Sequence, residues 1–401
     1  MNILYVCHRF PFPPKRGGKI RPFNMIRHFS ASHRVTVASL VRSKSEAAEG
    51  SGIASHCVRF EMGHVNESMQ ALRMVARLPT SVPSSLGYFY SAPLARRIRA
   101  MLARERFDLI FVHCSSVAQY VEHVTDVPKI LDFGDMDSQK WLEYARYKPF
   151  PLSLGYALEG RKLEREERRL ASRFDLCTAT TRGEWETLER YRTGVATDWF
   201  PNGVDGEMFT PGDEPHDPDT LVFVGRMDYY PNQECMFDFC ANVLPKLQAN
   251  RRTIKLQIVG ADPSAAVQKL AELPGVTVTG SVPDVRPYAR RAALMVAPLN
   301  IARGTQNKIL EGMAMGLPVV SSRVAAEGVD AQAGAHFRVA NSPDEYVSEI
   351  MRIINDPAER DRLARAGRAR MLSHHSWPAS MQRLDAIVER CMSLAASRKA
   401  A

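Results

Sequence analysis

The sequence has no cysteine pair at metal or redox spacing and no long apolar run. Seven cysteines are scattered over 401 residues, none of them in a C-x-x-C motif. Their odd number and irregular spacing argue against a disulfide framework and a zinc site. No apolar run approaches the roughly 20 residues of a membrane span. The run Ile3–Cys7 is too short for a signal-peptide core and is followed by His8 and Arg9, so we interpret it as a first β-strand and expect a cytoplasmic protein.

Acidic residues are scarce in the first quarter of the chain. Residues 1–100 contain 15 Lys and Arg but only 4 Asp and Glu, a balance of +11, whereas the remaining 301 residues balance at −2. The net charge of +9 therefore comes entirely from this region. A localised basic field attracts anionic partners such as nucleic acid, anionic lipid or a phosphorylated substrate. Improved solubility alone is the alternative explanation.

Strand-like apolar runs alternate with helical patterns along the whole chain, which predicts parallel sheets covered by helices. The length predicts two domains, and we expect two doubly wound α/β domains with a cleft between them. The expected boundaries are 1–200 for an N-terminal domain, 201–220 for a linker, 221–375 for a C-terminal domain and 376–401 for a helix packing back toward the N-terminal domain. The predicted strands are Ile3–Cys7, Arg34–Leu40, Leu109–His113, Ile130–Phe133, Leu176–Thr180, Leu221–Val224, Leu256–Val259, Val276–Thr279, Leu294–Pro298 and Pro318–Ser321.

The segment Gly304–Gly316, GTQNKILEGMAMG, is the strongest functional signal in the chain. A glycine turn opens a helix that carries Lys308 and Glu311 three residues apart, and therefore on one face. The free N–H groups of a helix N-terminus suit an anion such as phosphate. A carboxylate one turn further along can accept hydrogen bonds from a sugar diol. The segment predicts a site for a nucleoside-diphosphate compound; an ordinary ion pair on a solvated helix face is the alternative.

Three further features follow predicted strands, at the sheet edge where open α/β folds bind ligands. The loop Pro13–Lys19 places three cations around the paired glycines Gly17 and Gly18, which suits an anion, although a plain turn fits equally well. Arg226 follows a strand and can hold a diphosphate with both arms of its guanidinium group, or it is an ordinary surface arginine. His113 ends a strand, where a lone histidine is more often structural than functional.

Taken in order, the motifs of the C-terminal half resemble those of the retaining glycosyltransferases of family 4. They are FPNGVD, FVGRM, LQIVGADP, VTVTGSVPDVRPYARRAALMVAPL and GTQNKILEGMAMGLPVVSS. The N-terminal half is similar through Gly17-Gly18, the spacing from Asp108 to His113, and the string LDFGDMDS. The GTQNK and DMDSQKW strings resemble a subgroup of sugar transferases associated with exopolysaccharide gene clusters and PEP-CTERM. The resemblance implies the GT-B fold, in which two Rossmann-like domains face each other across a cleft.

The resemblance also implies roles for individual residues. Glu311 would hold the donor ribose, Arg226 would bind the diphosphate, and His113 takes the place of the family's histidine near the donor sugar. The expected catalytic residues are His113, Arg226, Lys308 and Glu311. The expected donor site adds Gly17 and Gly18 at the phosphates, the backbone around Ser281 and Val282 at the base, and Arg303, Gly304, Thr305, Gln306 and Asn307.

The chain departs from the family's pattern at two places. The usual signature has two glutamates with seven residues between them, but here Arg303 stands eight positions before Glu311. The lysine that commonly follows the strand-end arginine is also missing, and we expect Lys308 to supply that cation. Arg303 would then bind an acidic sugar or a phosphate oxygen, while the first-turn amides of residues 305–307 hold sugar hydroxyls.

A D-x-D sequence, Asp135-Met136-Asp137, matches the metal motif of the other large glycosyltransferase fold but lies in the N-terminal half. We expect Asp135, Asp137 and Ser138 to border the acceptor, with a helix cap made by Asp137 as the alternative. Fixed cations and helix amides can stabilise the leaving diphosphate in place of a metal. We therefore expect no metal and no cofactor.

These patterns predict a metal-independent retaining hexosyltransferase, acting in the synthesis of exopolysaccharide or another cell-surface glycan. The expected partners are a nucleotide-sugar donor of the UDP or GDP type and a glycan or lipid-linked acceptor. The alternatives are a GT-B epimerase of nucleotide sugars and a non-catalytic nucleotide-sugar binder. Nucleic acid is not an expected partner, because no basic motif interleaved with aromatic residues is present.

A membrane surface is a further expected partner. The segment Leu94–Leu102, LARRIRAML, has cations and apolar residues at helical spacing. This pattern predicts adsorption to an anionic membrane, with the protein peripheral on the inner face of the cytoplasmic membrane.

Overall fold

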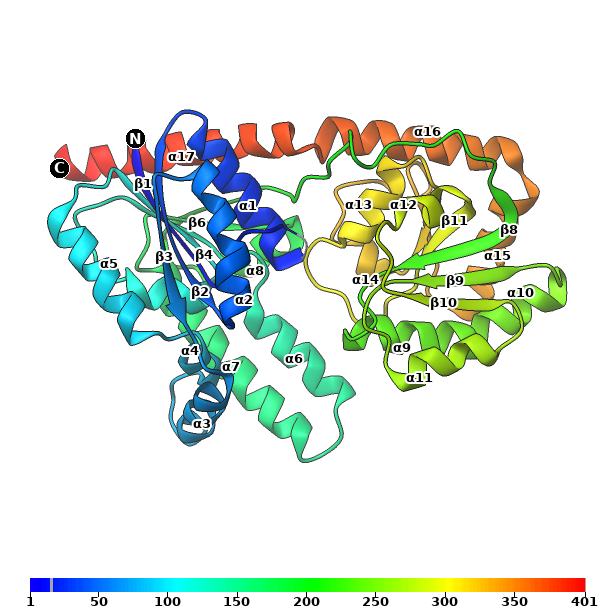
Figure 1. Cartoon of the computed structure of the whole chain (residues 1–401), viewed down its shortest axis with the longest axis horizontal. Coiled ribbons are helices and arrows are strands. Elements are labelled where there is room, and N and C mark those ends of the chain that lie inside the picture. Colours follow the sequence, from blue (N-terminus) through cyan, green and yellow to red (C-terminus); the bar gives the residue numbers. More distant parts are fainter. Residues whose placement is uncertain (15–16, 401) are drawn as a thin grey trace. The chain divides into compact units, whose positions relative to one another are not determined.

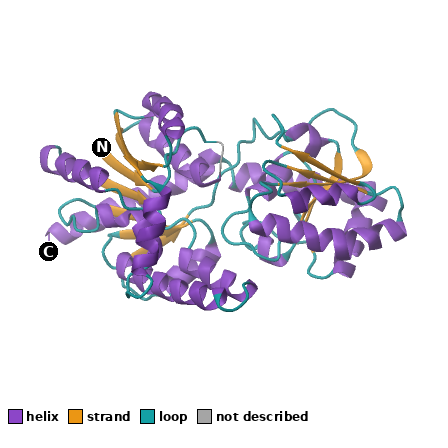
Figure 2. Ribbon diagram, turned by 60° about the horizontal axis from the view of Figure 1, so that its bottom comes forward, coloured by secondary structure: helices purple, strands orange, loops and turns teal. Residues whose placement is uncertain are grey.

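The computed structural model describes residues 1–14 and 17–400, which form two compact units (Figure 1). The first unit contains Met1–Phe200 together with Met381–Ala401, and the second contains Pro201–Ser380. The chain therefore returns to the first unit within its last helix, α17 (Trp377–Ala400). Each unit has a parallel sheet with helices on both faces (Figure 2).

The first unit has a seven-stranded sheet in the order β3-β2-β1-β4-β5-β6-β7. The interior strand β1 is apolar from Ile3 to Cys7, because helices cover both faces of the sheet and leave no solvated side. Leu4 of this strand pairs with Thr36 on one side and Ile110 on the other. The strands are β1 (Asn2–Cys7), β2 (Arg34–Val41), β3 (Arg59–His64), β4 (Leu109–His113), β5 (Lys129–Asp132), β6 (Leu176–Ala179) and β7 (Ala196–Trp199).

Eight α-helices and two 3-10 helices of the first unit connect these strands within the described residues. The pair α6 and α7 forms an antiparallel hairpin that extends from the body of the unit (Figure 1). The helices are α1 (Gly17–Ser30), α2 (Lys44–Gly50), η1 (Ser51–His56), α3 (Glu67–Arg77), α4 (Ser84–Tyr88), α5 (Ala92–Arg104), η2 (Ser115–Tyr120), α6 (Asp137–Tyr147), α7 (Leu152–Ala171) and α8 (Arg182–Glu189).

The second unit has a six-stranded sheet in the order β10-β9-β8-β11-β12-β13. The strands are β8 (Asp217–Val224), β9 (Lys255–Val259), β10 (Val276–Gly280), β11 (Ala292–Ala297), β12 (Val319–Ser321) and β13 (Arg338–Val339). The helices are α9 (Tyr230–Asp238), η3 (Phe239–Val243), α10 (Leu244–Asn250), α11 (Ala265–Gln268), η4 (Lys269–Glu272), α12 (Arg286–Arg290), α13 (Asn307–Ala314), α14 (Arg323–Ala326), α15 (Pro343–Asn355) and α16 (Pro357–His374).

All ten predicted strands are present, and the prediction of parallel sheets is confirmed. Three further strands, β3, β7 and β13, were not predicted, and each lies at an edge of its sheet. Edge strands are buried on fewer sides, so their sequences carry weaker apolar patterns. The strand β8 begins at Asp217, inside the segment predicted as a linker.

The helix α5 corrects the expectation for the segment Leu94–Leu102. Its apolar residues Leu94, Ile98 and Met101 are buried in the core of the first unit, and the arginines of the segment face outward. The prediction that this segment adsorbs to a membrane through its apolar side chains is therefore wrong, because those side chains are already packed. Among the described residues, no helix is long and apolar enough to cross a membrane.

Candidate active site

Two glycines form a close backbone contact at the end of β8. Gly260 has φ +153°, and a Cβ atom on it would lie 1.9 Å from the carbonyl oxygen of Gly225. The Gly225 amide in turn donates to the Val259 carbonyl at 3.0 Å. A Cβ atom on Gly225 would lie 2.8 Å from Nδ2 of Asn232 and 3.3 Å from Nζ of Lys308. Gly260 is therefore needed for the close approach to the backbone of Gly225, and Gly225 for the close approach to the side chains of Asn232 and Lys308.

Gly260→Ala is expected to destabilise the protein by about 2–4 kcal/mol, because the new methyl group must displace backbone rather than a flexible side chain. Gly334→Ala is the matched control. Gly334 also has a positive φ, +81°, but nothing lies within 4 Å of a Cβ atom there. The control should cost only about 1 kcal/mol. Urea unfolding measures both; equal losses would show that the close contact contributes nothing.

Lys308 lies partly buried beside this strand end. Its Nζ donates to Oδ1 of Asn232 at 2.6 Å and lies 4.5 Å from the centroid of the Phe223 ring. Asn232 also donates from Nδ2 to the Arg226 carbonyl at 2.8 Å. The amide of Asn232 therefore links the lysine to the backbone of the strand-end arginine.

Glu311 lies one turn after Lys308 on α13, and the two groups influence each other's protonation. Burial lowers the pKa of Lys308 to about 8, although Cys235 and Glu311 oppose this. Burial raises the pKa of Glu311 to about 7, and Lys308 opposes that shift. The partly buried ammonium of Lys308 and carboxylate of Glu311 thus suit a ligand that carries both phosphate and hydroxyl groups.

Arg226 is partly exposed and ion-paired on its own unit. Its Nη2 atom lies 2.6 Å from Oδ2 of Asp228 and 2.6 Å from Oδ2 of Asp262. Hydrogen bonding to Asp228 raises the pKa of Arg226 further, with Asp262 adding to the effect. A diphosphate would have to compete with these two carboxylates for the guanidinium group.

The N-terminus of α13 is open to a ligand. Gln306, at the N-cap, makes no capping hydrogen bond with its side chain, and Gly304 before it has φ +61°. Oγ1 of Thr305 is buried without a hydrogen-bond partner. Asn307, the first helical residue, lies with Oδ1 3.4 Å from Nδ2 of Asn202. The uncapped first turn and the unsatisfied hydroxyl are both suited to an anion or a sugar hydroxyl.

The other residues expected at the donor site, Arg303, Ser281 and Val282, differ in exposure and in their contacts. Arg303 is exposed, and its carbonyl accepts from Nε2 of Gln306 at 3.1 Å. Ser281 is exposed after β10, while Val282 packs against the core of the second unit. The backbone around Ser281 and Val282 is therefore held in place by the valine side chain.

In the first unit, His113 belongs to a buried charged network. Its Nδ1 atom lies 2.7 Å from Oδ2 of Asp132, a fully buried carboxylate. Asp132 also accepts from Nε of Arg21 at 3.0 Å and from Oγ1 of Thr178 at 2.9 Å. A carboxylate can only accept, so Nδ1 carries the proton and the histidine is fixed in one tautomer and orientation. His113 is thus more than an isolated strand-end histidine.

The D-x-D residues surround the start of α6. Asp135 accepts from Oγ1 of Thr180 at 2.9 Å. Asp137 is buried, which raises its pKa, and its Oδ2 lies 3.9 Å from Sγ of Cys114. Ser138 is fully buried, and both its amide and its hydroxyl donate to Glu167. The side chain of Ser138 is thus used in a buried hydrogen bond to Glu167. Asp135 and Asp137 remain the residues that can border an acceptor.

Gly17 and Gly18 begin α1, directly after the loop that follows β1. A Cβ atom on Gly18 would lie 3.4 Å from Cδ of Arg9. Of the three cations predicted in the loop Pro13–Lys19, Lys15 and Arg16 lie outside the described residues. Within residues 1–14 and 17–400, no group of three or more His, Cys, Asp or Glu side chains is arranged to hold a metal ion.

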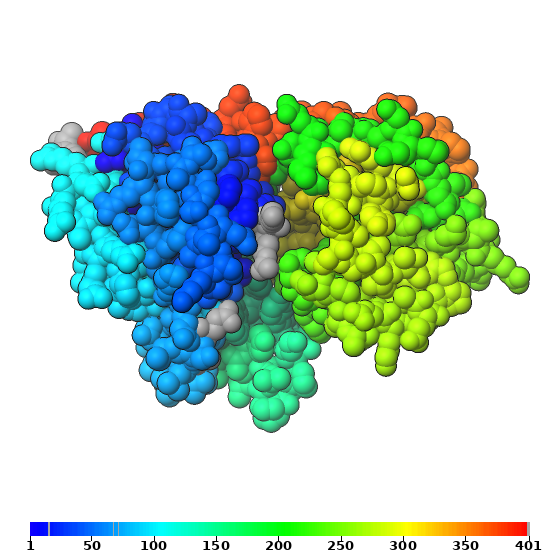
Figure 3. Space-filling model, in the orientation of Figure 1, coloured from blue at the N-terminus to red at the C-terminus, as the bar shows by residue number. Residues whose placement is uncertain are grey.

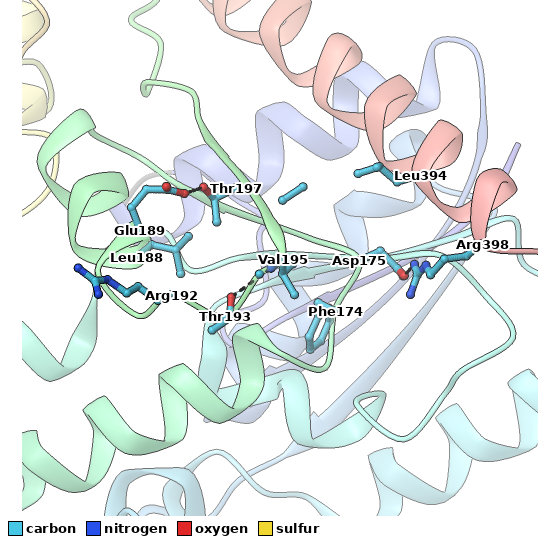
Figure 4. A pocket seen from close by; sticks show the side chains of 12 residues that line it. Phe174, Asp175, Leu188, Glu189, Arg192, Thr193, Val195, Thr197, Leu394 and Arg398 are labelled. Carbon is cyan, nitrogen blue, oxygen red and sulfur yellow. Dashed lines mark hydrogen bonds and ion pairs between the residues drawn. The ribbon is translucent and has the colours of Figure 1, made fainter. Parts of the chain in front are cut away.

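A pocket of about 520 Å³ lies elsewhere in the first unit, beside β6 and β7 (Figure 4). Its lining includes Asp175 before β6, Val195 before β7 and Arg398 of α17, which pairs with Asp175. These residues stand at the amino ends of the strands. Ligands of open parallel sheets bind at the carboxyl ends, so this pocket is not the expected substrate site.

Sequence reasoning missed four residues of these sites: Asn232, Gly260, Asp132 and Arg21. Asn232 is distant in sequence from the lysine it holds, and no spacing rule connects the two. Asp132 did carry a signal, because a carboxylate ending a strand next to the strand of His113 is expected to lie near it.

Known proteins are similar to this chain in sequence and in fold. Residues 218–356 match the protein family described as glycosyl transferases group 1. A D-inositol 3-phosphate glycosyltransferase of Nocardiopsis dassonvillei is 27% identical over an alignment of length 252, and the match covers 55% of this chain and 57% of that protein. The protein of the same name from Thermobifida fusca is 26% identical over an alignment of length 271, and the match covers 60% of this chain and 61% of that protein. The matched part thus spans well under two thirds of either relative.

Solved structures are similar over nearly the whole chain. HepE of Anabaena in complex with UDP has a TM-score of 0.70 at 15% identity, covering 97% of this chain and 100% of that one. Sucrose-phosphate synthase from Thermosynechococcus elongatus has a TM-score of 0.70 at 16% identity, covering 98% and 100%. Together with the two parallel-sheet units, these similarities show that the chain has the GT-B fold.

Proposed function

We propose that this protein is a retaining glycosyltransferase that moves a hexosyl group from a nucleoside-diphosphate sugar to an acceptor hydroxyl. The observation that carries the proposal is the partly buried pair Lys308 and Glu311 on α13, next to Gly225 and Arg226 at the end of β8. These groups lie within the part of the chain that matches the group 1 glycosyl transferases. HepE of Anabaena has been solved with UDP and with UDP-glucose, which supports a nucleotide-sugar donor, with UDP as the first nucleotide to test.

The chemistry follows from charge. Departure of the nucleotide builds negative charge on the diphosphate, and Lys308, Arg226 and the open amides of α13 would stabilise it where it develops. Glu311, as a carboxylate, would accept hydrogen bonds from the ribose diol. His113, held through Nδ1 by Asp132, would present its other nitrogen to the donor sugar. With fixed cations at the diphosphate, we propose that no metal is required.

Retention is proposed through attack on the same face that the leaving group departs from, with a phosphate oxygen taking the acceptor proton. We further propose a glycan or lipid-linked acceptor, bordered by Asp135 and Asp137, in exopolysaccharide or other cell-surface glycan synthesis. Such an acceptor would place the protein at the inner face of the cytoplasmic membrane.

A thermal-shift panel of UDP-, GDP-, ADP- and dTDP-sugars tests donor binding. A ligand at 100 times its Kd stabilises the folded state by about 2.7 kcal/mol, so one nucleotide family should raise Tm by several degrees. Glu311→Gln should abolish the shift without unfolding the protein. A panel without any stabilising nucleotide sugar would contradict the proposal.

The pH dependence of kcat/KM for the donor is expected to be bell-shaped. Glu311 must be ionised to accept hydrogen bonds, so activity should rise as pH passes about 7, and Lys308 must be charged, so activity should fall above about 8. The Glu311→Gln variant should lack the ascending limb, while the descending limb should persist. Initial rates between pH 5.5 and pH 10 provide the measurement, and a profile flat from about pH 6 to 9 would refute the assignment.

A further inference from the structure

Large apolar side chains are exposed in two neighbouring elements of the first unit. On α3 and just after it, Leu72, Val75 and Leu78 are 67%, 61% and 58% exposed. Phe150 of the turn between α6 and α7 is 81% exposed, and Leu152 and Leu154 in the first turn of α7 are 58% and 54% exposed. We call these six side chains the apolar patch. Apolar side chains gathered in this way mark an interaction surface more often than scattered single residues do.

The exposure on α3 is a consequence of how the helix packs. Gln70 is buried and donates from Nε2 to the Tyr90 carbonyl at 3.1 Å. Leu72, Val75 and Leu78, three residues apart, form a stripe that faces solvent. A polar residue turned inward and leucines turned outward are the reverse of the arrangement expected for a helix covering a water-soluble core.

The two elements of the apolar patch are fixed to one another. Nζ of Lys162 on α7 donates to the Leu78 carbonyl at 2.8 Å, and Glu159 on α7 accepts from the amide of Ser85 on α4 at 2.9 Å. A Cβ atom on Gly160 would lie 2.7 Å from Cγ of Leu142, so α6 and α7 are in close contact. Figure 3 shows the α6–α7 hairpin and α3 extending from the same side of the first unit.

The charges and aromatic rings around the apolar patch identify its partner. From Tyr144 to Leu158 the sequence contains Arg146 and Lys148 and no acidic residue. Behind the turn, the rings of Trp141 and Tyr156 pack 5.0 Å apart. Side chains that bind an anionic membrane surface are arranged by depth: apolar side chains reach the acyl chains, Trp and Tyr lie at the interface, and basic residues meet the headgroups. The tip has apolar side chains, Trp and Tyr behind them, and basic residues alongside, so it fits such a surface.

We propose that the apolar patch inserts into the surface of an anionic lipid bilayer, with Arg146 at the headgroups. Basic residues near such a surface attract its anionic headgroups, and the burial of apolar side chains adds to this attraction. The inference deepens the proposed function by naming the surface through which the protein meets a lipid-linked acceptor. Lipid binding is measured without donor, however. Vesicle binding can therefore be absent in a protein that transfers sugar, and it can be present in a protein that does not.

Vesicle flotation of the full chain tests the inference, using phosphatidylcholine vesicles with and without phosphatidylglycerol. We expect binding to the anionic vesicles only, weakened by high salt. The triple variant Phe150→Ser, Leu152→Ser, Leu154→Ser should bind about tenfold more weakly or worse, as should Leu72→Ser with Val75→Ser. Arg146→Gln should make binding to the anionic vesicles less sensitive to salt than the binding of wild type.

Matched controls separate this surface from general stickiness. Leu273→Ser removes an exposed apolar side chain of the second unit, and Arg96→Gln with Arg99→Gln removes exposed charges of α5; both should bind like wild type. The emission of Phe150→Trp should shift to shorter wavelength with anionic vesicles. Undiminished binding by the triple variant would overturn the inference. So would a wild-type dimer that ignores vesicles and dissociates in the triple variant, because a second copy would then cover the apolar patch.

Discussion

Lys308→Met is expected to lower kcat/KM for the nucleotide sugar by about 10²–10³-fold, the loss typical when one preorganised group is removed from a developing oxyanion. Methionine keeps the length and apolar stem of lysine but removes the ammonium that Asn232 aligns from 2.6 Å. Because burial opposes the charge of Lys308, as its pKa of about 8 records, the variant should keep its Tm within a few degrees of wild type. Steady-state kinetics with the donor identified in the thermal-shift panel provide the measurement.

Lys246→Met is the matched control for that loss. Lys246 lies on α10 of the same unit, its side chain is 51% exposed, and it pairs with Asp344 at 2.6 Å. An exposed pair of this kind is worth about 0–1 kcal/mol, so kcat/KM should stay within about twofold of wild type. If Lys308→Met were equally active, the diphosphate cation would have to be Arg226 alone or a residue of the other unit.

Asp132→Asn is expected to destabilise the protein by about 3–5 kcal/mol, because the guanidinium of Arg21 would be left buried without its counter-charge. Burial alone raises the pKa of Asp132, but Arg21 and His113 outweigh it and hold the pKa well below the usual range. For a carboxylate with a lowered folded-state pKa, the stabilisation is present above the unfolded pKa of about 4 and is lost as pH falls below it. The difference between wild type and variant should therefore shrink on acidification.

Two comparisons make this prediction specific. Asp198→Asn removes an exposed carboxylate of the same unit, which lies 3.5 Å from Arg390, and should cost less than about 1 kcal/mol. The double variant Arg21→Met, Asp132→Leu removes both buried charges and should be more stable than Asp132→Asn. Urea unfolding at pH 7 and pH 3 measures all three. A double variant no more stable than Asp132→Asn would contradict the buried-charge explanation.

The sequence allowed much of the fold to be predicted, because buried parallel strands are apolar on both faces. The run Ile3–Cys7 shows this, and each predicted strand has a counterpart in the sheets. The edge strand β3, Arg59–His64, was missed because only Phe60 and Met62 of its six residues are large and apolar, so it contains no apolar run. The strand β13 has only two residues, too few for any pattern to register.

Helical periodicity correctly placed two side chains on one face of α13, but for α5 it led to the wrong prediction of what covers the apolar face. Lys308 and Glu311 were predicted on one face of α13, and their mutual effect on pKa agrees with that placement. For α5 the same periodicity was taken as a membrane-adsorbing pattern, yet Leu94 and Ile98 face the core. Spacing identifies an apolar stripe but does not say whether protein or lipid covers it, and this is also why the exposed stripe of α3 was not foreseen.

The measurement that tests the central claim most directly is the ¹H NMR spectrum of the sugar released from an α-linked nucleotide sugar. Water serves as the acceptor, and the spectrum is recorded before mutarotation is complete. A retaining glycosyltransferase should release the nucleoside diphosphate and the α anomer together, and Lys308→Met should abolish both. First release of the β anomer, conversion of the donor to its epimer, or release undiminished in Lys308→Met would contradict the account.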